Sequence, residues 1–303
     1  MSNSANLQNS PVLRSQLTSF GLIEVSGTDA RLFLHNQLSN DLLNLAPDRA
    51  QWTAYCSPKG RMLAGFLAWG APPDRIYLAC DRALVPGLVK RLRMFVLRAK
   101  VVIDDVSERY ALSGVTGGAD ENIPFQLALT DDSMHIALPA VDGQQRTLVI
   151  GPALAASAAS DDETGWNAMM IAAGEVWLTP ATQDQFVPQM VNFDAIGGIN
   201  FKKGCYPGQE VVARAHYRGA VKRRMYPARV SGAAIAGQPL FSGGIDAQEC
   251  GMIANAITTA DGSSTVLAVL PIQSRFETTI HLAAVDGPVL TFLDLPYVIP
   301  EHL

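Results

Sequence analysis

The spacing of apolar residues predicts short strands and helices in the first part of the chain. Residues 20–27 are typical of a short strand. Thr28 is placed to cap a helix whose apolar residues recur at helical spacing, at Ala30, Phe33, Leu34 and Leu38. Two further strands, 51–57 and 62–69, flank a turn that contains proline and glycine.

The next predicted helix raises a question about where it begins. It follows a strand over 75–80 and runs from Asp81 to about Lys100, with leucine, phenylalanine and valine on one face. Pro86 lies too far inside this segment for a regular first turn, because proline has no N–H to donate. We therefore expect the helix to begin after Asp81.

The middle of the chain mixes strands and helices without strict alternation. Strands are predicted over 101–106, 109–115, 134–138 and 146–150. A short helix is expected over 153–159 and another over 166–173, with Gly174 as a stop. This mixture indicates an α+β fold rather than a doubly wound sheet.

The pattern changes after Pro227. Residues 228–303 contain short β-like runs separated by glycines and polar turns, without a helical period. They predict a small C-terminal β-barrel or sandwich. The chain is accordingly divided into domains 1–226 and 227–303, which suits its length of 303 residues.

Composition narrows the class of protein. The chain is 48% hydrophobic and 17% charged, so it can bury a sizeable core. No segment reaches the roughly 18 apolar residues that indicate a membrane span. Residues 1–11 are polar and lack the features of a signal peptide, so a cytoplasmic location is expected.

Cysteine usage points to the same compartment. The chain has four cysteines, and none lies in a CxxC pair or beside a histidine: Cys56, Cys80, Cys205 and Cys250. This spacing argues against a zinc site and against a disulfide-stapled secreted domain. It also argues against an iron–sulfur cluster held by this chain alone, since a cluster usually needs about four thiolates. No metal site is predicted.

Charge is distributed unevenly. The net charge is −5, but residues 202–229 contain eight lysines and arginines against Glu210 alone. That segment therefore carries +7 and the remainder −12. A basic segment on an acidic protein indicates a local anion site, and the alternative is a solvated basic face.

The most informative segment starts inside this basic stretch. Pro207 and Gly208 stand where a helix over 209–216 is expected to start, with Val211, Val212 and Ala215 facing inward. A helix N-terminus preceded by Lys202 and Lys203 favours anion binding.

Cys205 lies just before that helix and has two interpretations. Nearby amides and lysines favour its thiolate, which would make it nucleophilic. The alternative is a small buried thiol under a turn, and the local sequence supports both equally. His216 cannot be paired with it from the sequence.

Three segments carry a resemblance to a known family. The string Lys203 to Glu210, KGCYPGQE, followed by VVAR, resembles the K-G-C-Y-x-G-Q-E signature of the YgfZ-type folate-binding proteins. Residues 27–41 resemble the family's N-terminal G-x-D-A…F-L-x-x-Q-x-x-x-D segment, and residues 55–63 resemble its C-x-P-K-G-R turn. With the β-rich C-terminus, the resemblance covers nearly the whole chain.

The resemblance implies a fold and a role. Members of this family are related to the glycine-cleavage aminomethyltransferases, which have two interwoven α+β lobes, a C-terminal barrel and a central channel. It implies that a tetrahydrofolate, or a one-carbon derivative, binds in the channel. It further implies support of iron–sulfur protein assembly or repair, including enzymes that thiolate tRNA. The positions associated with function fall on Lys203 and Cys205.

One segment departs from the transferases. They carry an Arg and a Glu in an L-R-L-E-A-G-like helix, where this chain has Met170 and Ala172. These side chains can neither form an ion pair nor accept a pterin hydrogen bond. The departure counts against transferase chemistry, and whether a one-carbon transfer is catalysed is left open.

Folate chemistry assigns candidate roles to other residues. Tyr206 is a candidate for the pterin slot, Gln209 or Glu210 for the pterin edge, and Asn36, Gln37 and Asp41 for channel-facing polar contacts. The tail carboxylates suit arginines, here Arg214, Arg218 or Arg223.

Each of these roles has a structural alternative. Gln209 and Glu210 are also typical of helix capping, and Arg218, Arg223 and Arg224 of an exposed face. Asn36, Gln37 and Asp41 are equally typical of a helix surface. Lys59 and Arg61 suit a hairpin tip as well as a ligand. Cys56, Trp166 and Trp177 are interpreted as core residues.

Three functions follow in order of preference. The first is a folate-binding accessory protein for iron–sulfur maturation and tRNA modification, with iron–sulfur and tRNA-modifying proteins as partners. The second is a folate-dependent aminomethyltransferase. The third is an RNA-binding module on the basic segment, but the segment has no recognisable RNA-binding fold, so direct nucleic-acid binding is not expected. No membrane partner is expected.

Overall fold

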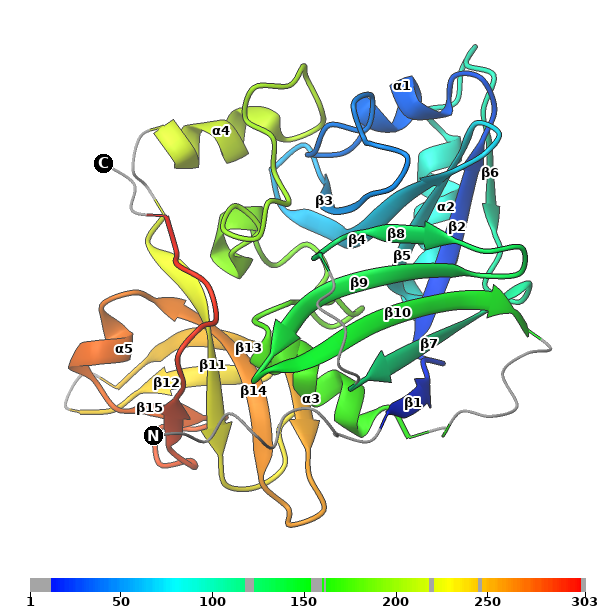
Figure 1. The fold of residues 1–303 in the computed structure, drawn as a ribbon. Coiled ribbons are helices and arrows are strands. Elements are labelled where there is room, and N and C mark those ends of the chain that lie inside the picture. Colours follow the sequence, from blue (N-terminus) through cyan, green and yellow to red (C-terminus); the bar gives the residue numbers. More distant parts are fainter. Residues whose placement is uncertain are drawn as a thin grey trace, which may run out of the picture. The chain divides into compact units, whose positions relative to one another are not determined.

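The computed structural model describes residues 12–117, 123–153, 160, 162–217, 221–244 and 247–300. It is a mixed α+β structure with three sheets of five, six and five strands (Figure 1). The predicted fold class is therefore confirmed. Within the described residues no helix is both long and apolar enough to cross a membrane.

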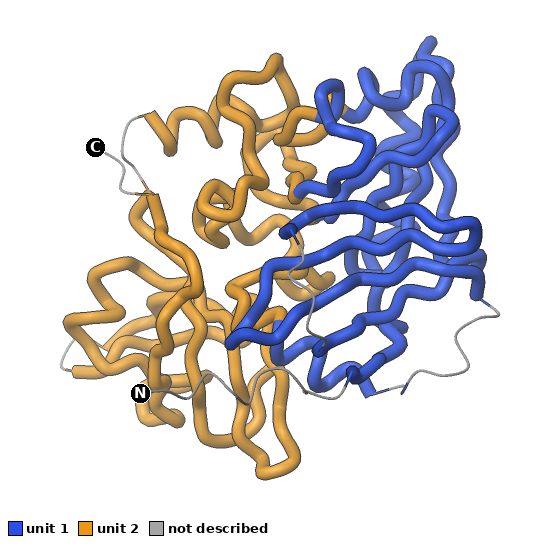
Figure 2. Tube along the Cα trace, in the orientation of Figure 1, with its two compact units in different colours: residues 1–34, 42–51, 66–169 blue, residues 35–41, 52–65, 170–303 orange. Residues whose placement is uncertain are grey.

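The chain forms two compact units that interleave along the sequence (Figure 2). Unit 1 comprises residues 1–34, 42–51 and 66–169, and unit 2 comprises residues 35–41, 52–65 and 170–303. The predicted division at residues 226 and 227 falls inside unit 2 and stays a prediction.

Unit 1 contains most of two five-stranded sheets. The first has the order β1-β7-β10-β9-β8, with bounds β1 Leu13–Gln16, β7 Tyr110–Thr116, β10 Gln144–Pro152, β9 Met134–Val141 and β8 Leu127–Leu129. The second has the order β3-β4-β5-β2-β6, with bounds β3 Ala50–Cys56, β4 Met62–Ala71, β5 Arg75–Asp81, β2 Phe20–Ser26 and β6 Val102–Asp105. The predicted strands are present, while β1 and β8 were not predicted because they are short and mostly exposed.

The helix after β5 begins late, as expected. The Asp81 carboxylate accepts a hydrogen bond of 2.9 Å from the Ala83 N–H and caps a 3-10 turn, η2 (Arg82–Leu84). The helix α2 (Val85–Arg93) then starts with proline in its first turn, where the missing N–H costs nothing.

The predicted end of that helix near Lys100 is wrong. The helix ends at Arg93, whose guanidinium donates to the Ile103 carbonyl, since the chain must turn back to form β6. Phe95, expected on the apolar face, is 43% exposed, and Leu97 beyond it is 87% accessible.

Two other helices bear on the site. The helix α1 (Ala30–His35) is shorter than its apolar spacing suggests, because Leu38 bridges to Tyr55 instead. The helix α3 (Thr164–Ala172) ends as predicted at Gly174, which has a φ of 65°. The Glu175 N–H donates to the Met170 carbonyl at 3.0 Å, closing a Schellman motif. The helix predicted over 153–159 lies almost wholly outside the described residues.

The C-terminal part of unit 2 is a nearly closed barrel. Its strand order is β15-β12-β13-β14-β11-β16, with bounds β15 Ile280–Leu282, β12 Pro239–Ser242, β13 Glu249–Thr258, β14 Ser264–Pro271, β11 Arg223–Val230 and β16 Leu290–Phe292. The bridge between His281 and Val289 brings the two edges together. The barrel alternative is confirmed, while β12, β16 and the one-turn helix α5 (Ser274–Glu277) were not predicted.

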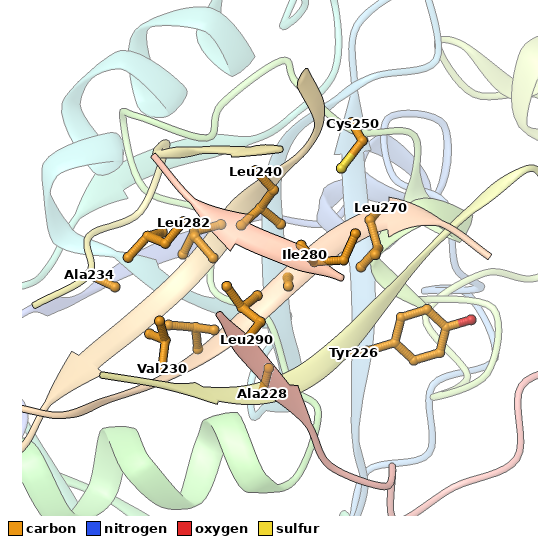
Figure 3. Close-up of a cluster of buried hydrophobic side chains, with 13 residues drawn as sticks. Tyr226, Ala228, Val230, Ala234, Leu240, Cys250, Leu270, Ile280, Leu282 and Leu290 are labelled. Atoms are coloured by element: carbon orange, nitrogen blue, oxygen red, sulfur yellow. The ribbon is translucent and has the colours of Figure 1, made fainter. Parts of the chain in front are cut away.

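Alternation of side chains builds the core of this barrel. Every second residue of β11, at Tyr226, Ala228 and Val230, points into the same buried cluster (Figure 3). The paired strand β14 contributes Val266, Ala268 and Leu270 in the same way. The sequence distinguished this region from the helical parts of the chain by its short β-like runs between glycines and polar turns.

Candidate functional site

Three segments that lie far apart in the sequence meet within unit 2. They are residues 35–41 after α1, the turn over 57–61, and residues 197–210 leading into α4 (Gln209–Tyr217). These are the segments that carried the motif resemblance, and contacts between their residues define the candidate site.

The turn and the start of α4 pack through two glycines. Gly208 has a φ of 79°, and a Cβ there would lie 2.4 Å from the Ser57 carbonyl oxygen and 2.7 Å from the Cα of Gly60. Gly60 has a φ of 71°, and a Cβ there would lie 2.7 Å from the Cβ of Val211. Only glycine allows this approach, so the motif glycines bring the turn against α4.

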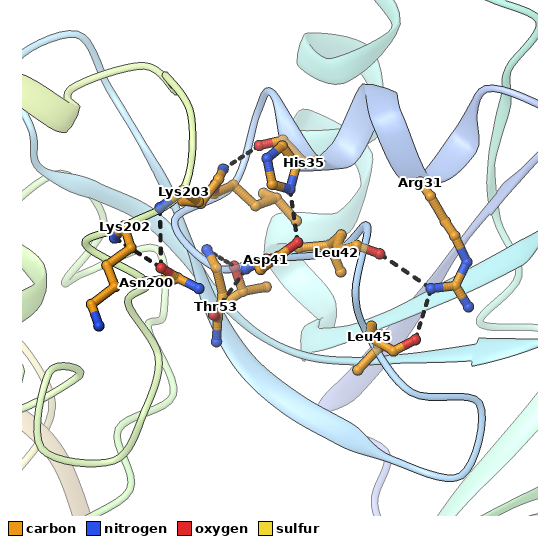
Figure 4. A network of polar contacts seen from close by, with 11 residues as sticks. Arg31, His35, Asp41, Leu42, Leu45, Thr53, Asn200, Lys202 and Lys203 are labelled. Carbon is orange, nitrogen blue, oxygen red and sulfur yellow. Dashed lines mark hydrogen bonds and ion pairs between the residues drawn. The ribbon is translucent and has the colours of Figure 1, made fainter.

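Lys203 connects the same loop to the end of α1. Its Nζ donates to the Leu38 carbonyl at 2.6 Å and to the His35 carbonyl (Figure 4). A cation is favoured there, because carbonyl groups at a helix C-terminus carry partial negative charge. The Nζ also lies 4.9 Å above the centre of the Tyr206 ring.

Backbone contacts hold the loop in place around Lys203. The Asn200 side chain accepts from the Lys202 N–H at 2.9 Å and the Lys203 N–H at 3.1 Å. The Ser39 hydroxyl donates to the Gly198 carbonyl at 2.6 Å, and the Asn40 amide donates to the Gly197 carbonyl at 2.7 Å. Short polar side chains thus hold the loop that carries Lys203 and join it to the segment after α1 that Lys203 contacts.

Electrostatics at the site are shifted by burial. Burial lowers the pKa of Lys203 to about 8, and the charges of Asp41 and Cys205 oppose this shift. The His35 Nδ1 lies 3.1 Å from the Asp41 carboxylate. The pKa of His35 is lowered by burial and by Lys203, with Asp41 acting in the opposite direction.

We expect Lys203 to lose its proton well below the range of a solvated lysine. Acylation with acetic anhydride, followed by mass spectrometry from about pH 6.5 to 10.5, should show half-maximal reactivity of Lys203 near pH 8, because only the neutral amine reacts. N-acetyl-lysine amide is the control and should titrate at about pH 10.4. An Asp41→Asn variant should move the Lys203 midpoint lower. A midpoint for Lys203 equal to that of the control would contradict the assignment.

Cys205 differs from the other cysteines in exposure. It is accessible, whereas Cys56, Cys80 and Cys250 are buried. Burial raises the pKa of Cys56 to about 12, which confirms its interpretation as a core thiol. The alternative of a buried thiol at Cys205 is therefore wrong, while its nucleophilic role stays a prediction.

The predicted folate residues divide into two groups. Near Lys203 lie Asp41, the ring of Tyr206, which is 7% exposed, and the Gln209 amide, which donates to the Lys203 carbonyl at 3.4 Å. Exposed on the surface of unit 2 are Asn36, Glu210, Arg214 and Arg223. Arg218 lies outside the described residues.

Some expectations about the surrounding residues need correction. Val211, expected inward, is 40% exposed and lies against Gly60. Arg224, considered for an exposed face, is buried in a bidentate ion pair with Asp194 at 2.6 and 2.9 Å. Trp166 and Trp177 are buried, as predicted.

Sequence reasoning missed two members of the site. His35 pairs with Asp41, and Asn200 caps the turn before Lys203. Both residues lie inside or beside motif segments, and that position was the signal that could have found them. His35 pairs with a residue six positions away, and Asn200 accepts from backbone N–H groups. Local spacing does not reveal such pairs.

The chain also has a sizeable cavity beside the barrel. Its volume is about 790 Å³, and its walls include Arg224, Tyr226, Arg275, Phe276 and Tyr297. None of the motif residues above lines it. Within the described ranges no cluster of three or more His, Cys, Asp or Glu residues could hold a metal ion.

The architecture matches a solved structure of the aminomethyltransferase class. Glycine cleavage system aminomethyltransferase T from Bartonella henselae superposes with a TM-score of 0.72 at 13% identity, covering 97% of this chain and 88% of that chain. At this identity the likeness establishes the fold. The chain therefore has the aminomethyltransferase fold, in which the Lys203–Cys205 loop forms part of a three-segment cluster.

Curated relatives give the family. A protein named tRNA-modifying protein YgfZ from Vibrio vulnificus (strain YJ016) is 30% identical over 95% of this chain and 93% of its own length. One of the same name from Sodalis glossinidius is 29% identical over 96% and 94%. An uncharacterized Haemophilus influenzae protein is 34% identical over 69% and 71%. The chain belongs to the YgfZ family. No family model matches it.

Proposed function

We propose that this protein binds a tetrahydrofolate and supports iron–sulfur protein maturation on which tRNA modification depends. The observation that carries the proposal is the meeting of the three motif segments: Lys203 binds the carbonyls of the segment after α1, and Gly208 packs against the turn over 57–61. The aminomethyltransferase fold and the relatives named tRNA-modifying protein support it.

The residues present fit a folate. A pterin edge needs placed donors and acceptors, which the Asp41 carboxylate, the Gln209 amide and the exposed Glu210 supply. Asn36 adds a further exposed amide after α1. When bound, the folate would supply a one-carbon carrier.

The remaining proposed roles concern charge and reactivity. Arg214, Arg218 and Arg223 would hold the carboxylates of the glutamate tail. Lys203 would hold its loop against the end of α1 and supply a cation beside the ligand. The Tyr206 ring packs beneath the Lys203 ammonium group. Exposed Cys205 is the reactive group that would meet a client protein.

The transferase alternative is disfavoured at α3. Met170 is 5% exposed and packs in the core, and the helix ends at Ala172, just before the Gly174 cap. The segment thus offers neither a cation nor a carboxylate, which an aminomethyltransferase-type helix would present. We therefore assign an accessory role rather than glycine cleavage.

Calorimetry with tetrahydrofolate tests the folate part. The intact protein should bind, and Lys203→Met should bind about ten- to 100-fold more weakly, because it loses charge-assisted hydrogen bonds that hold the loop. Lys90→Met is the matched control, since Lys90 is an exposed lysine of α2, outside the candidate site. Thermal melting confirms that each variant folds. Absence of binding by the intact protein would refute the folate assignment.

Complementation tests the maturation part. In cells that lack this protein, Cys205→Ser should restore neither iron–sulfur enzyme activity nor thiolated tRNA bases, measured by mass spectrometry of digested tRNA. The same variant should still bind tetrahydrofolate. Full restoration by Cys205→Ser would remove the proposed role of this thiol.

A further inference from the structure

A compact aromatic cluster lies at the end of α4. The Phe201 and His216 rings stack in parallel, with centroids 3.7 Å apart and an interplanar angle of 12°. The Tyr217 ring stands edge-on to His216, at 4.9 Å and 76°. Tyr217 is 67% exposed, so packing against the protein does not account for its position. The Phe201–His216 stack contacts one side of the Tyr217 ring, and the rest of that ring is open to solvent.

Tyr217 shares its helix face with a cation. Arg214 precedes it by three residues, and Glu210 by seven, a spacing that places all three on one side of α4. All three are exposed, while Val212 is buried on the opposite side. Arg214 and Tyr217 are therefore neighbouring positions on the exposed surface of the helix.

The charge around this ring is positive. Lys202 follows Phe201 directly, and neither Lys202 nor Arg214 has an ion-pair partner within the described part of the chain. Glu210 is the single acidic residue between 201 and 217. On a protein with a net charge of −5, this patch attracts a polyanion locally.

We propose that the face formed by Lys202, Arg214 and Tyr217, which we call the α4 face, docks a single-stranded stretch of RNA. An unpaired base stacks on Tyr217, and the flanking phosphates contact Arg214 and Lys202. This inference deepens the proposed function and rests on its tRNA part. The α4 face shares Arg214 with the proposed glutamate-tail contact, so variants of Lys202 and Tyr217 separate RNA binding from folate binding.

The composition of the α4 face favours RNA over a protein or a lipid surface. A lipid-binding helix needs a broad apolar face, and the core of a protein interface is depleted in lysine and glutamate, whereas exposed Lys202 and Glu210 stand on or beside the α4 face. Val211 is the aliphatic residue next to this face; it is 40% exposed, and part of its side chain lies against Gly60. Tyr206 and Tyr226, the other tyrosines of the basic segment, are buried, so Tyr217 alone among them can stack on a base.

Fluorescence anisotropy with a labelled RNA of about ten nucleotides tests the proposal, without folate. Tyr217→Ala should weaken binding about tenfold, and Tyr217→Phe should restore it, since stacking needs the ring and not the hydroxyl. Lys202→Ala and Arg214→Ala should each reduce the slope of log affinity against log salt by about 0.7. Phe276→Ala, which removes an exposed aromatic ring from α5, is the control and should have no effect.

Three outcomes would overturn the proposal. They are unchanged affinity in Tyr217→Ala, preferential binding of a duplex of the same sequence, and equal binding of polyglutamate, which would show a general anion surface. Because α4 is solvent-facing at these positions, the variants should retain their melting temperature. A fourth outcome, no RNA binding by the intact protein while it still binds tetrahydrofolate, would reject the α4 face and leave the folate assignment standing.

Discussion

Gly208→Ala is expected to lower the free energy of unfolding by about 2–5 kcal/mol, combining left-handed backbone strain with overpacking. The new Cβ would lie 2.4 Å from the Ser57 carbonyl oxygen and 2.7 Å from the Cα of Gly60, both of which are backbone atoms that cannot rotate away. The loop carrying Lys203 should separate from the turn, so tetrahydrofolate affinity should fall as well. Urea unfolding and calorimetry measure the two effects.

Variants of two other glycines in the same unit separate the effect of backbone strain from the effect of overpacking. Gly197 has a φ of 76°, but a Cβ added there would meet no heavy atom within 4 Å, so Gly197→Ala should cost only the backbone strain, about 1–2 kcal/mol. Gly204 has ordinary space and no positive φ, and Gly204→Ala should be nearly neutral. Equal losses in Gly208→Ala and Gly197→Ala would show that close packing of the turn contributes nothing.

Arg224→Met is expected to cost about 3–5 kcal/mol, because it leaves the Asp194 carboxylate buried without its cation. Both side chains are 2% exposed, and the Arg224 guanidinium also donates to the Gln189 carbonyl at 2.7 Å. The Gln189 amide in turn donates to the Val212 carbonyl at 2.7 Å, so this pair connects β11 to α4. Thermal unfolding followed by circular dichroism measures the loss.

Two further variants test the explanation. The double variant Arg224→Met/Asp194→Leu should recover much of the lost stability, since it removes the stranded charge. Asp294→Asn breaks an ion pair with Arg275 at 3.4 Å whose carboxylate is fully exposed, and it should change stability by less than about 0.5 kcal/mol. If the double variant is no more stable than Arg224→Met, lost packing rather than the unpaired carboxylate is the cause.

Secondary structure followed local spacing where an element had a buried side. The strands β2, β4 and β14 were predicted from short apolar runs, since strands that are buried on both faces contain few polar residues. The helix α4 was predicted from its apolar spacing, in which Val212 is buried as expected and Val211 is not. The short strands β1 and β8 carry too few buried residues to produce a period. The end of α2 was misplaced because apolar residues continue past Arg93 on an exposed segment.

The candidate site was predictable only in part. Through family resemblance, the motif strings marked Lys203 and Cys205 as positions associated with function. They did not reveal that Lys203 binds the carbonyls of His35 and Leu38, since backbone acceptors have no sequence signature. The basic segment also suggested that Arg224 lies on an exposed face. Its ion pair with Asp194 was not foreseen, because Asp194 stands 30 residues earlier in the sequence.

Amino-acid order alone was sufficient for the fold class, the barrel at the C-terminus and the family, because periodicity and short motifs are local properties of the chain. Long-range contacts decided which charges are buried, which tyrosine of the basic segment is exposed, and how Gly60 meets Gly208. The physical reason is that burial and desolvation depend on neighbours brought together by folding. The pKa of Lys203 and the accessibility of Tyr217 therefore belong to the tertiary structure rather than to the motif.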